Sequence, residues 1–221
     1  MRTYYSVDAK PYHFEFETAS TAFLIIDMQR DFLLPGGFGE ALGNDVSATN
    51  VIIPHVKKML DKARELGMFV IHTREGHRPD LSDVPPSKMR RGGDIGKPGP
   101  MGRILVRGEY GHDIVDELQP IDGEPIIDKP GKGSFYQTDL EVILQSKGIK
   151  SLLVAGVTTH VCVQTTIREA NDRGYECLML EDCCAAFDRR DHEDSIRMIH
   201  QQGGIFGWTA PSANVLSALD K

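Results

Sequence analysis

Hydrophobic positions along the chain gather into short continuous runs instead of alternating with polar ones. The strongest runs are TAFLIID, MFVIHT and SLLVAG, at residues 21–27, 68–73 and 151–156, and weaker ones occur in EPIIDK and ECLMLED. Near-continuous apolar runs of this length are typical of strands that are covered on both faces, as in a parallel sheet. We therefore expect these segments to form a central sheet.

Between these runs lie segments in which apolar residues recur with the helical period of about 3.6 residues. Three of them end at a glycine, a common helix stop: NVIIPHVKKMLDKARELG, TDLEVILQSKG and VCVQTTIREANDRG. Strand and helix alternate along the chain, which predicts an α/β fold, doubly wound and three-layered, with a central, mostly parallel sheet.

The length and composition of the chain predict its organisation. A chain of 221 residues can form one large core, and we expect a single domain over residues 1–221, with residues 1–20 as an N-terminal extension. Residues 76–108 are dense in proline, glycine and charge and are too many for an ordinary connection. This stretch is predicted to be a functional loop or an oligomer contact.

Charge, hydropathy and cysteine content indicate the compartment of the protein and argue against some classes of partner. Lys and Arg total 25 against 32 Asp and Glu, and the basic residues are scattered, which argues against nucleic acid or an anionic membrane as partner. No apolar run approaches the roughly 20 residues of a membrane span, and the polar N-terminus lacks the h-region of a secretory signal, so we expect neither feature. We expect a cytoplasmic protein whose four cysteines are free thiols.

Three reactive side chains occur where predicted strands end. Asp27 closes FLIID, Lys129 follows PIID, and Cys162 begins the helix after LLVAG. Because ligands of open parallel sheets bind beyond the carboxyl ends of the strands, one cleft is expected to collect all three. A cysteine in the first turn of a helix faces unpaired N–H groups and the positive end of the dipole, which favour the thiolate.

Together these residues can perform nucleophilic catalysis. Asp27 can take the proton of Cys162 and return it to a leaving amine, while Lys129 holds the carboxylate in place. The turn GVTTH can supply backbone N–H groups for an oxyanion hole. Taken alone, each residue has a simpler interpretation: a small buried hydrophobe for Cys162, a helix N-cap for Asp27 and a surface charge for Lys129.

Three ordered motifs resemble those of the isochorismatase-like cysteine hydrolases, whose catalytic triad is Asp, Lys and Cys. The motifs are FLIIDMQRDFLLPGG, DKPGKGSFYQTDLE and VAGVTTHVCVQTTIREANDRGY, and the resemblance runs from about residue 21 to the C-terminus. It implies that Asp27 is the acid/base, that Cys162 is the nucleophile, and that Lys129 is the triad lysine in preference to Lys132.

The same resemblance implies further features of the site. The Val157–Thr158 peptide is expected to be cis, so that the amides of Thr158 and Cys162 point at a substrate oxyanion. Nicotinamidases of the family carry a metal-binding Asp and His group, but His72 and His77 do not match its spacing. We therefore expect no metal and no cofactor. By resemblance the protein is also expected to be a homotetramer.

Within the superfamily the sequence most resembles biuret hydrolase and its triuret-cleaving relatives, near the N-carbamoylsarcosine amidohydrolases. This resemblance implies that a small neutral ureide is hydrolysed with release of ammonia. His160 and Tyr136 depart from the pattern inside the motifs and can alter which ureide fits. The segments that carry the resemblance are HTREGHRPDL, GPMGRIL, IIDKPGKGSF, REANDRGYECLMLEDCC and QGGIFG.

Glu75, Gln202 and Phe32 are the candidate substrate contacts. Glu75 follows a strand and can accept N–H bonds from a ureide, or it can simply pair with Arg74 or with the long loop. Gln202 offers an acceptor and donors, but it also fits a solvated helix end. Phe32 lies one turn beyond Asp27 and can wall the pocket, although packing explains it equally well.

Two other functions stay open at this stage. One is an amidohydrolase for an N-carbamoyl amino acid or a ureidoacrylate, whose substrate carboxylate needs an arginine such as Arg74 or Arg168. The other is a non-catalytic binding protein that keeps the fold as an oligomer. Retention of all three triad residues counts against the second.

Overall fold

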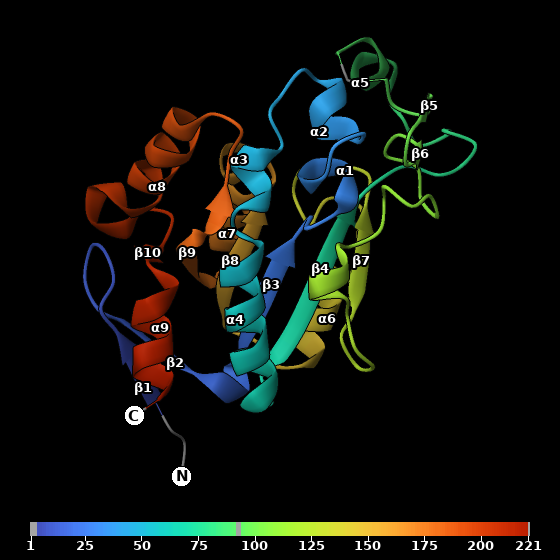
Figure 1. Ribbon diagram of the computed structural model, residues 1–221. Coiled ribbons are helices and arrows are strands. Elements are labelled where there is room, and N and C mark those ends of the chain that lie inside the picture. Colours follow the sequence, from blue (N-terminus) through green and yellow to red (C-terminus); the bar gives the residue numbers. More distant parts are fainter. Residues whose placement is uncertain (1–3, 92–93, 221) are drawn as a thin grey trace.

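A six-stranded parallel sheet forms the centre of the computed structural model, which describes residues 4–91 and 94–220 (Figure 1). The strand order is β10-β9-β8-β3-β4-β7, and every neighbouring pair is parallel. The strands are β3 (Thr21–Ile26), β4 (Phe69–Glu75), β7 (Ile126–Lys129), β8 (Ser151–Val157), β9 (Glu176–Ala185) and β10 (Trp208–Ala210). The predicted runs all form strands of this sheet, and of its six strands only β10 has no counterpart among them.

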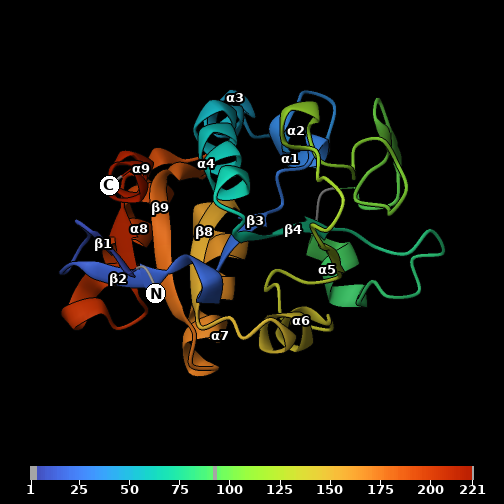
Figure 2. The same cartoon turned by 90° about the horizontal axis from the view of Figure 1, so that it is seen from below.

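Helices cover both faces of this sheet (Figure 2). Along β3, Phe23 and Ile25 join one apolar cluster, and Ala22, Leu24 and Ile26 join the other, because successive strand side chains point to opposite faces. This confirms the predicted three-layer α/β fold. Core residues come from α4 (Ile53–Glu65) and α9 (Ser212–Leu219) in the first cluster, and from α6 (Leu140–Ser146), α7 (Gln164–Asp172) and α8 (Arg189–Gly204) in the second.

The segment before β3 forms a small antiparallel hairpin. Its strands are β1 (Tyr4–Val7) and β2 (Phe14–Glu17), followed by the 3₁₀ turn η1 (Thr18–Ser20). No helix among the described residues is long and apolar enough to span a bilayer.

Short elements gather above the carboxyl ends of the strands, where Figure 1 shows α1, α2 and α5 together. The stretch 76–108 contributes helix α5 and a small hairpin, and its residues 92 and 93 lie outside the described part. Asp31 holds this region together, because its carboxylate accepts the backbone N–H groups of Phe38 and Leu105. These elements are α1 (Arg30–Leu33), α2 (Phe38–Ala41), α3 (Ser47–Asn50), α5 (Pro86–Arg91), β5 (Pro98–Gly99), β6 (Gly102–Arg103) and η3 (Thr159–Val163). The 3₁₀ turn η2 (Asp116–Leu118) packs against α4 instead.

Candidate active site

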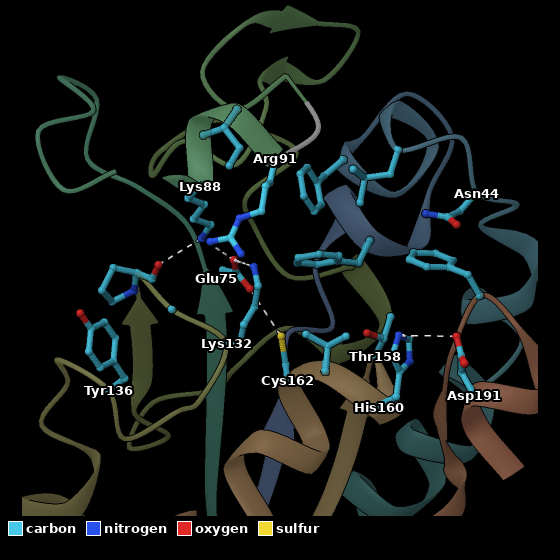
Figure 3. Close-up of a pocket in the computed structure, with 18 of the residues that line it drawn as sticks. Asn44, Glu75, Lys88, Arg91, Lys132, Tyr136, Thr158, His160, Cys162 and Asp191 are labelled. Carbon is cyan, nitrogen blue, oxygen red and sulfur yellow. Dashed lines mark hydrogen bonds and ion pairs between the residues drawn. The ribbon is translucent and has the colours of Figure 1, made fainter. Parts of the chain in front are cut away.

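A cavity of about 720 Å³ opens at this edge of the sheet. Its floor includes Glu75 at the end of β4 and Cys162 in η3, and its sides come from α1, α2, α5 and the start of α8 (Figure 3). Its lining includes Phe32, Phe38, Glu75, Lys88, Arg91, Lys132, Thr158, His160, Cys162, Phe187, Asp188 and Asp191.

Asp27 and Lys129 form a fully buried ion pair beneath the cavity. Lys129 Nζ lies 2.7 Å from Asp27 Oδ2, and both side chains have no exposed surface. The ammonium group also donates to the carbonyl oxygens of Gly131 and Lys132, at 3.0 and 2.9 Å. Thr73 Oγ1 donates to the other oxygen of Asp27 at 2.6 Å. Both charged groups are therefore held by neighbours on several sides.

Cys162 sits in a π-helical turn between β8 and α7. The carbonyl of Thr158 accepts the N–H groups of Val161 and Val163, at 3.0 and 3.3 Å, and the second bond, which spans five residues, makes this a wide turn. The Val157–Thr158 peptide is cis, as the family resemblance implied. Wide turns of this kind occur frequently at functional sites.

The three predicted triad residues come together with a second carboxylate, Glu75. A carboxylate oxygen of Asp27, a carboxylate oxygen of Glu75 and Cys162 Sγ all lie within 4.8 Å of one another. The thiol donates to Glu75 Oε2 at 3.4 Å, and Lys129 Nζ lies 3.7 Å from the same oxygen. The structure thus brings Asp27, Lys129 and Cys162 into one site, with Glu75 beside them.

Glu75 is the centre of a lysine cluster (Figure 3). Its Oε1 accepts Lys88 Nζ at 2.6 Å and Lys132 Nζ at 2.8 Å. Lys88 also donates to the carbonyl of Pro130 at 3.1 Å, which fixes α5 over the cavity. Because a buried carboxylate is costly without partners, these cations are what keep Glu75 ionised.

Burial controls the proton on the nucleophile. Burial raises the pKa of Cys162 well above its ordinary value; Lys129 opposes this rise, and the carboxylates of Asp27 and Glu75 add to it. Burial thus acts against the thiolate that a helix N-terminus favours, an effect that the sequence does not reveal. A thiol in such an environment needs a base at the moment of attack.

The two carboxylates of the site differ in basicity. Burial raises the pKa of Asp27, and Lys129 opposes this only in part. Burial acts on Glu75 too, but Lys129, Lys132 and Lys88 together hold the pKa of Glu75 well below its ordinary value. For Lys129, burial acts to lower the pKa, yet Asp27 and the other negative groups raise it above the usual range. Asp27 is therefore the better proton acceptor of the two.

Of the predicted substrate contacts, Glu75 and Phe32 line the cavity and Gln202 does not. Phe32 packs edge-to-face with Phe38, with ring centroids 5.6 Å apart. The start of α8 borders the cavity through Asp188 and Asp191. Gln202 is exposed in the turn that ends this helix, where φ is 52°. The helix between them is roughly 18 Å long, so Gln202 does not reach the cavity of its own chain.

The arginines that could have bound a substrate carboxylate also lie elsewhere. Arg74 pairs with Asp128 at 2.8 Å and with Asp113 at 3.0 Å, and Arg168 stacks on the ring of Phe206. Neither lines the cavity; Lys88 and Arg91 of α5 do. Sequence analysis missed both, although the basic run SKMRR inside residues 76–108 was a visible signal.

Chelators are expected to leave activity unchanged. Asp27, Glu75 and Cys162 are close enough to resemble a ligand set, but Lys129 Nζ lies 2.7 Å from one carboxylate and 3.7 Å from the other. A divalent cation there would face repulsion from a buried ammonium group. The measurement is ammonia release before and after EDTA dialysis. Loss of activity that zinc or manganese restores would contradict this expectation.

The chain is similar to known proteins over most of its length. A family model described as the isochorismatase domain matches residues 21–210. The chain is 34% identical over 188 residues to ureidoacrylate amidohydrolase RutB of Yersinia enterocolitica, covering 80% of each, and 32% identical over 219 residues to that of Agrobacterium fabrum, covering 93% and 92%. A cysteine hydrolase structure from Pseudomonas syringae aligns with a TM-score of 0.80 at 27% identity, covering 93% of this chain and 94% of that one.

Proposed function

The chain belongs to the isochorismatase family, and we propose that it is a cysteine-dependent amidohydrolase that cleaves a C–N bond of a small ureide bearing a carboxylate. Hydrolysis of an amide C–N bond agrees with the names of the two relatives described above, both ureidoacrylate amidohydrolases. The observation that carries the carboxylate is Arg91, a cation that points into the cavity beside the paired lysines (Figure 3).

The reaction follows from the groups in the site. Cys162 Sγ attacks the ureide carbonyl while its proton passes to Asp27, and the backbone amides of Thr158 and Cys162 stabilise the oxyanion. One C–N bond then breaks, and the departing nitrogen takes the proton from Asp27. Water hydrolyses the S–carbonyl bond and regenerates the thiol. Lys129 stays charged throughout and offsets the negative charge on its neighbours.

The wall formed by α5 and the loop after β7 favours an anionic substituent. Lys88 and Lys132 are shared with Glu75, which offsets one of their two charges. Arg91 Nε donates to the carbonyl of Ser87 at 3.1 Å, and no ion pair within residues 4–91 and 94–220 involves its guanidinium. This wall therefore has a net positive charge, and a guanidinium can bind a carboxylate through two parallel hydrogen bonds.

The aromatic lining of the cavity favours a flat substrate. Phe32, Phe38 and Phe187 are among its lining residues. Aromatic faces pack well against planar conjugated groups, such as a ureide joined to an acrylate. A planar chain with a carboxylate at one end would therefore lie between the rings and Arg91.

A neutral ureide such as biuret or triuret is the second candidate. Asp188 and Asp191 line the mouth of the cavity, and their negative charges oppose an incoming carboxylate. The segments HTREGHRPDL and IIDKPGKGSF carry the resemblance to that branch. The homotetramer implied by the family stays a prediction.

A substrate panel scored by ammonia release separates the two candidates. We expect 3-ureidoacrylate or an N-carbamoyl amino acid to react with kcat/KM on the order of 10⁴ M⁻¹s⁻¹ or above. Urea is expected to be a poor substrate, because it is too small to use the outer contacts that orient the carbonyl. Rapid cleavage of biuret or triuret with no reaction of the carboxylates would select the neutral candidate instead.

Arg91→Gln is expected to raise KM for a carboxylate-bearing ureide, with kcat changed much less. Removing a charged hydrogen bond costs about 1.5–3 kcal/mol, or roughly 10- to 100-fold. KM for biuret, if it reacts at all, should not change. Arg90→Gln is the matched control, because Arg90 lies on the same helix, is exposed and does not line the cavity. Equal effects of the two substitutions would contradict a specific role for Arg91.

A further inference from the structure

We propose that Glu75 is a positioning residue, which accepts the S–H bond of the resting Cys162 thiol and so orients the sulfur toward the substrate carbonyl. Its side chain ends β4, has about 1% of its surface exposed, and lies 3.4 Å from Sγ through Oε2. The effect of Glu75 on turnover rests on the proposed function. Its effect on the Cys162 thiol does not, because thiol reactivity is measured without substrate. It differs from the substrate contact that the sequence suggested.

The partners of Glu75 leave little room for a substrate group. Oε1 accepts both Lys88 and Lys132, while Oε2 accepts the thiol and lies 3.7 Å from Lys129 Nζ. A carboxylate has about four acceptor sites in all, so these contacts use most of them. Glu75 therefore holds groups that belong to the enzyme.

Glu75 is also a poor base for the reaction. Three ammonium groups stabilise its charge and hold its pKa well below the ordinary value, whereas burial raises the pKa of Asp27. Two carboxylates with environments this different commonly divide their roles. Asp27 takes the proton during attack, and Glu75 holds the S–H bond before it.

Glu75 affects Cys162 in two opposite ways. Its negative charge, like that of Asp27, disfavours the thiolate, whereas Lys129 and Lys132 favour it. Other charged or titratable groups also line the cavity. Lys88 contacts Glu75, and Arg91 lies beside Lys88. The side toward α8 carries His160, Asp188 and Asp191. Removing the charge of Glu75 should make the thiol more acidic and, at the same time, less well oriented.

Glu75→Gln is therefore expected to separate reactivity from turnover. The pH midpoint for iodoacetamide alkylation of Cys162, followed by peptide mass spectrometry without substrate, should move to lower pH, and the rate at pH 7 should rise on the order of tenfold. In the same protein kcat for the ureide should fall by roughly 10- to 100-fold, with a smaller change in KM. Glu117→Gln, on the exposed surface of η2, is the matched control and should change neither quantity.

If Glu75→Gln merely loosened the fold, the pattern of alkylation would differ from a specific effect on Cys162. Cys177, Cys183 and Cys184 are buried and should stay unmodified in Glu75→Gln unless the protein opens. Glu75→Asp keeps the charge that the lysines require and withdraws it by one methylene, so its alkylation midpoint should stay near that of the wild type while kcat falls about tenfold.

Three outcomes would overturn the proposal: an unchanged or higher alkylation midpoint in Glu75→Gln, an unchanged kcat in that variant, or full activity in Glu75→Asp. If Glu75→Gln does not fold, the kcat of Glu75→Asp decides alone. If the wild type cleaves no ureide, the proposed function is wrong, and the alkylation midpoint still decides whether Glu75 faces the thiol.

Discussion

Cys162→Ser is expected to reduce kcat on the order of 10⁴-fold or more while the fold and substrate binding persist. The side chain is 3% exposed and sits where Asp27 and the cavity meet. An alcohol has a far higher pKa than a thiol, and the same buried carboxylate cannot deprotonate it during attack. The measurements are ammonia release, the thermal unfolding midpoint, and substrate binding by calorimetry.

Cys177→Ser is the matched control for this substitution. Cys177 is equally buried but lies in β9, and it does not line the cavity. This variant should lose some stability, because it places a hydroxyl in the core, and should keep its turnover. Substantial activity in Cys162→Ser would show that Cys162 is not the nucleophile, and equal losses in both variants would point to damage of the fold instead.

The fold was predictable because its signals are local. Runs such as TAFLIID are apolar at consecutive positions, since β3 is buried on both faces, and glycines such as Gly148 end the helices with a positive φ of 66°. Strand β10 was missed because it has only three residues and one of them, Trp208, is half-buried. Such a strand depends on pairing with β9, which no local pattern reveals.

The triad was predictable from its place at the strand ends together with the family motifs. The charges around it were not, because they depend on elements far apart in the sequence. Glu75 meets Lys88 from α5 and Lys132 from the loop after β7. The protonation of Cys162 depends on how deeply the sulfur is buried, and a helix N-terminus in the sequence gives no measure of that depth.

Lys129→Met is expected to impair both activity and folding. Lys129 Nζ lies 2.7 Å from Asp27 and 3.7 Å from Glu75, so its removal leaves two buried carboxylates without their shared cation. Breaking a buried ion pair by removing one partner typically costs about 3–5 kcal/mol. Turnover should fall on the order of 10³-fold or more, because members of a triad act as a unit. Lys58→Met, at an exposed position on α4, is the control and should change neither quantity by much.

The stability loss of Lys129→Met should depend on pH with a definite sign. In the wild type the lysines hold the pKa of Glu75 below its ordinary value, so Glu75 contributes stability that is present at neutral pH and lost as the pH falls. Without Lys129, burial and mutual repulsion raise the folded-state pKa values of Asp27 and Glu75. As the pH falls, protonation of these two carboxylates then removes part of the stability loss of the variant. The gap in unfolding free energy between the two proteins should therefore be largest near pH 7 and smaller near pH 5, as chemical denaturation at both pH values would measure. A gap that is equal at both pH values would mean that Lys129 contributes packing only, and that Asp27 and Glu75 do not share its charge.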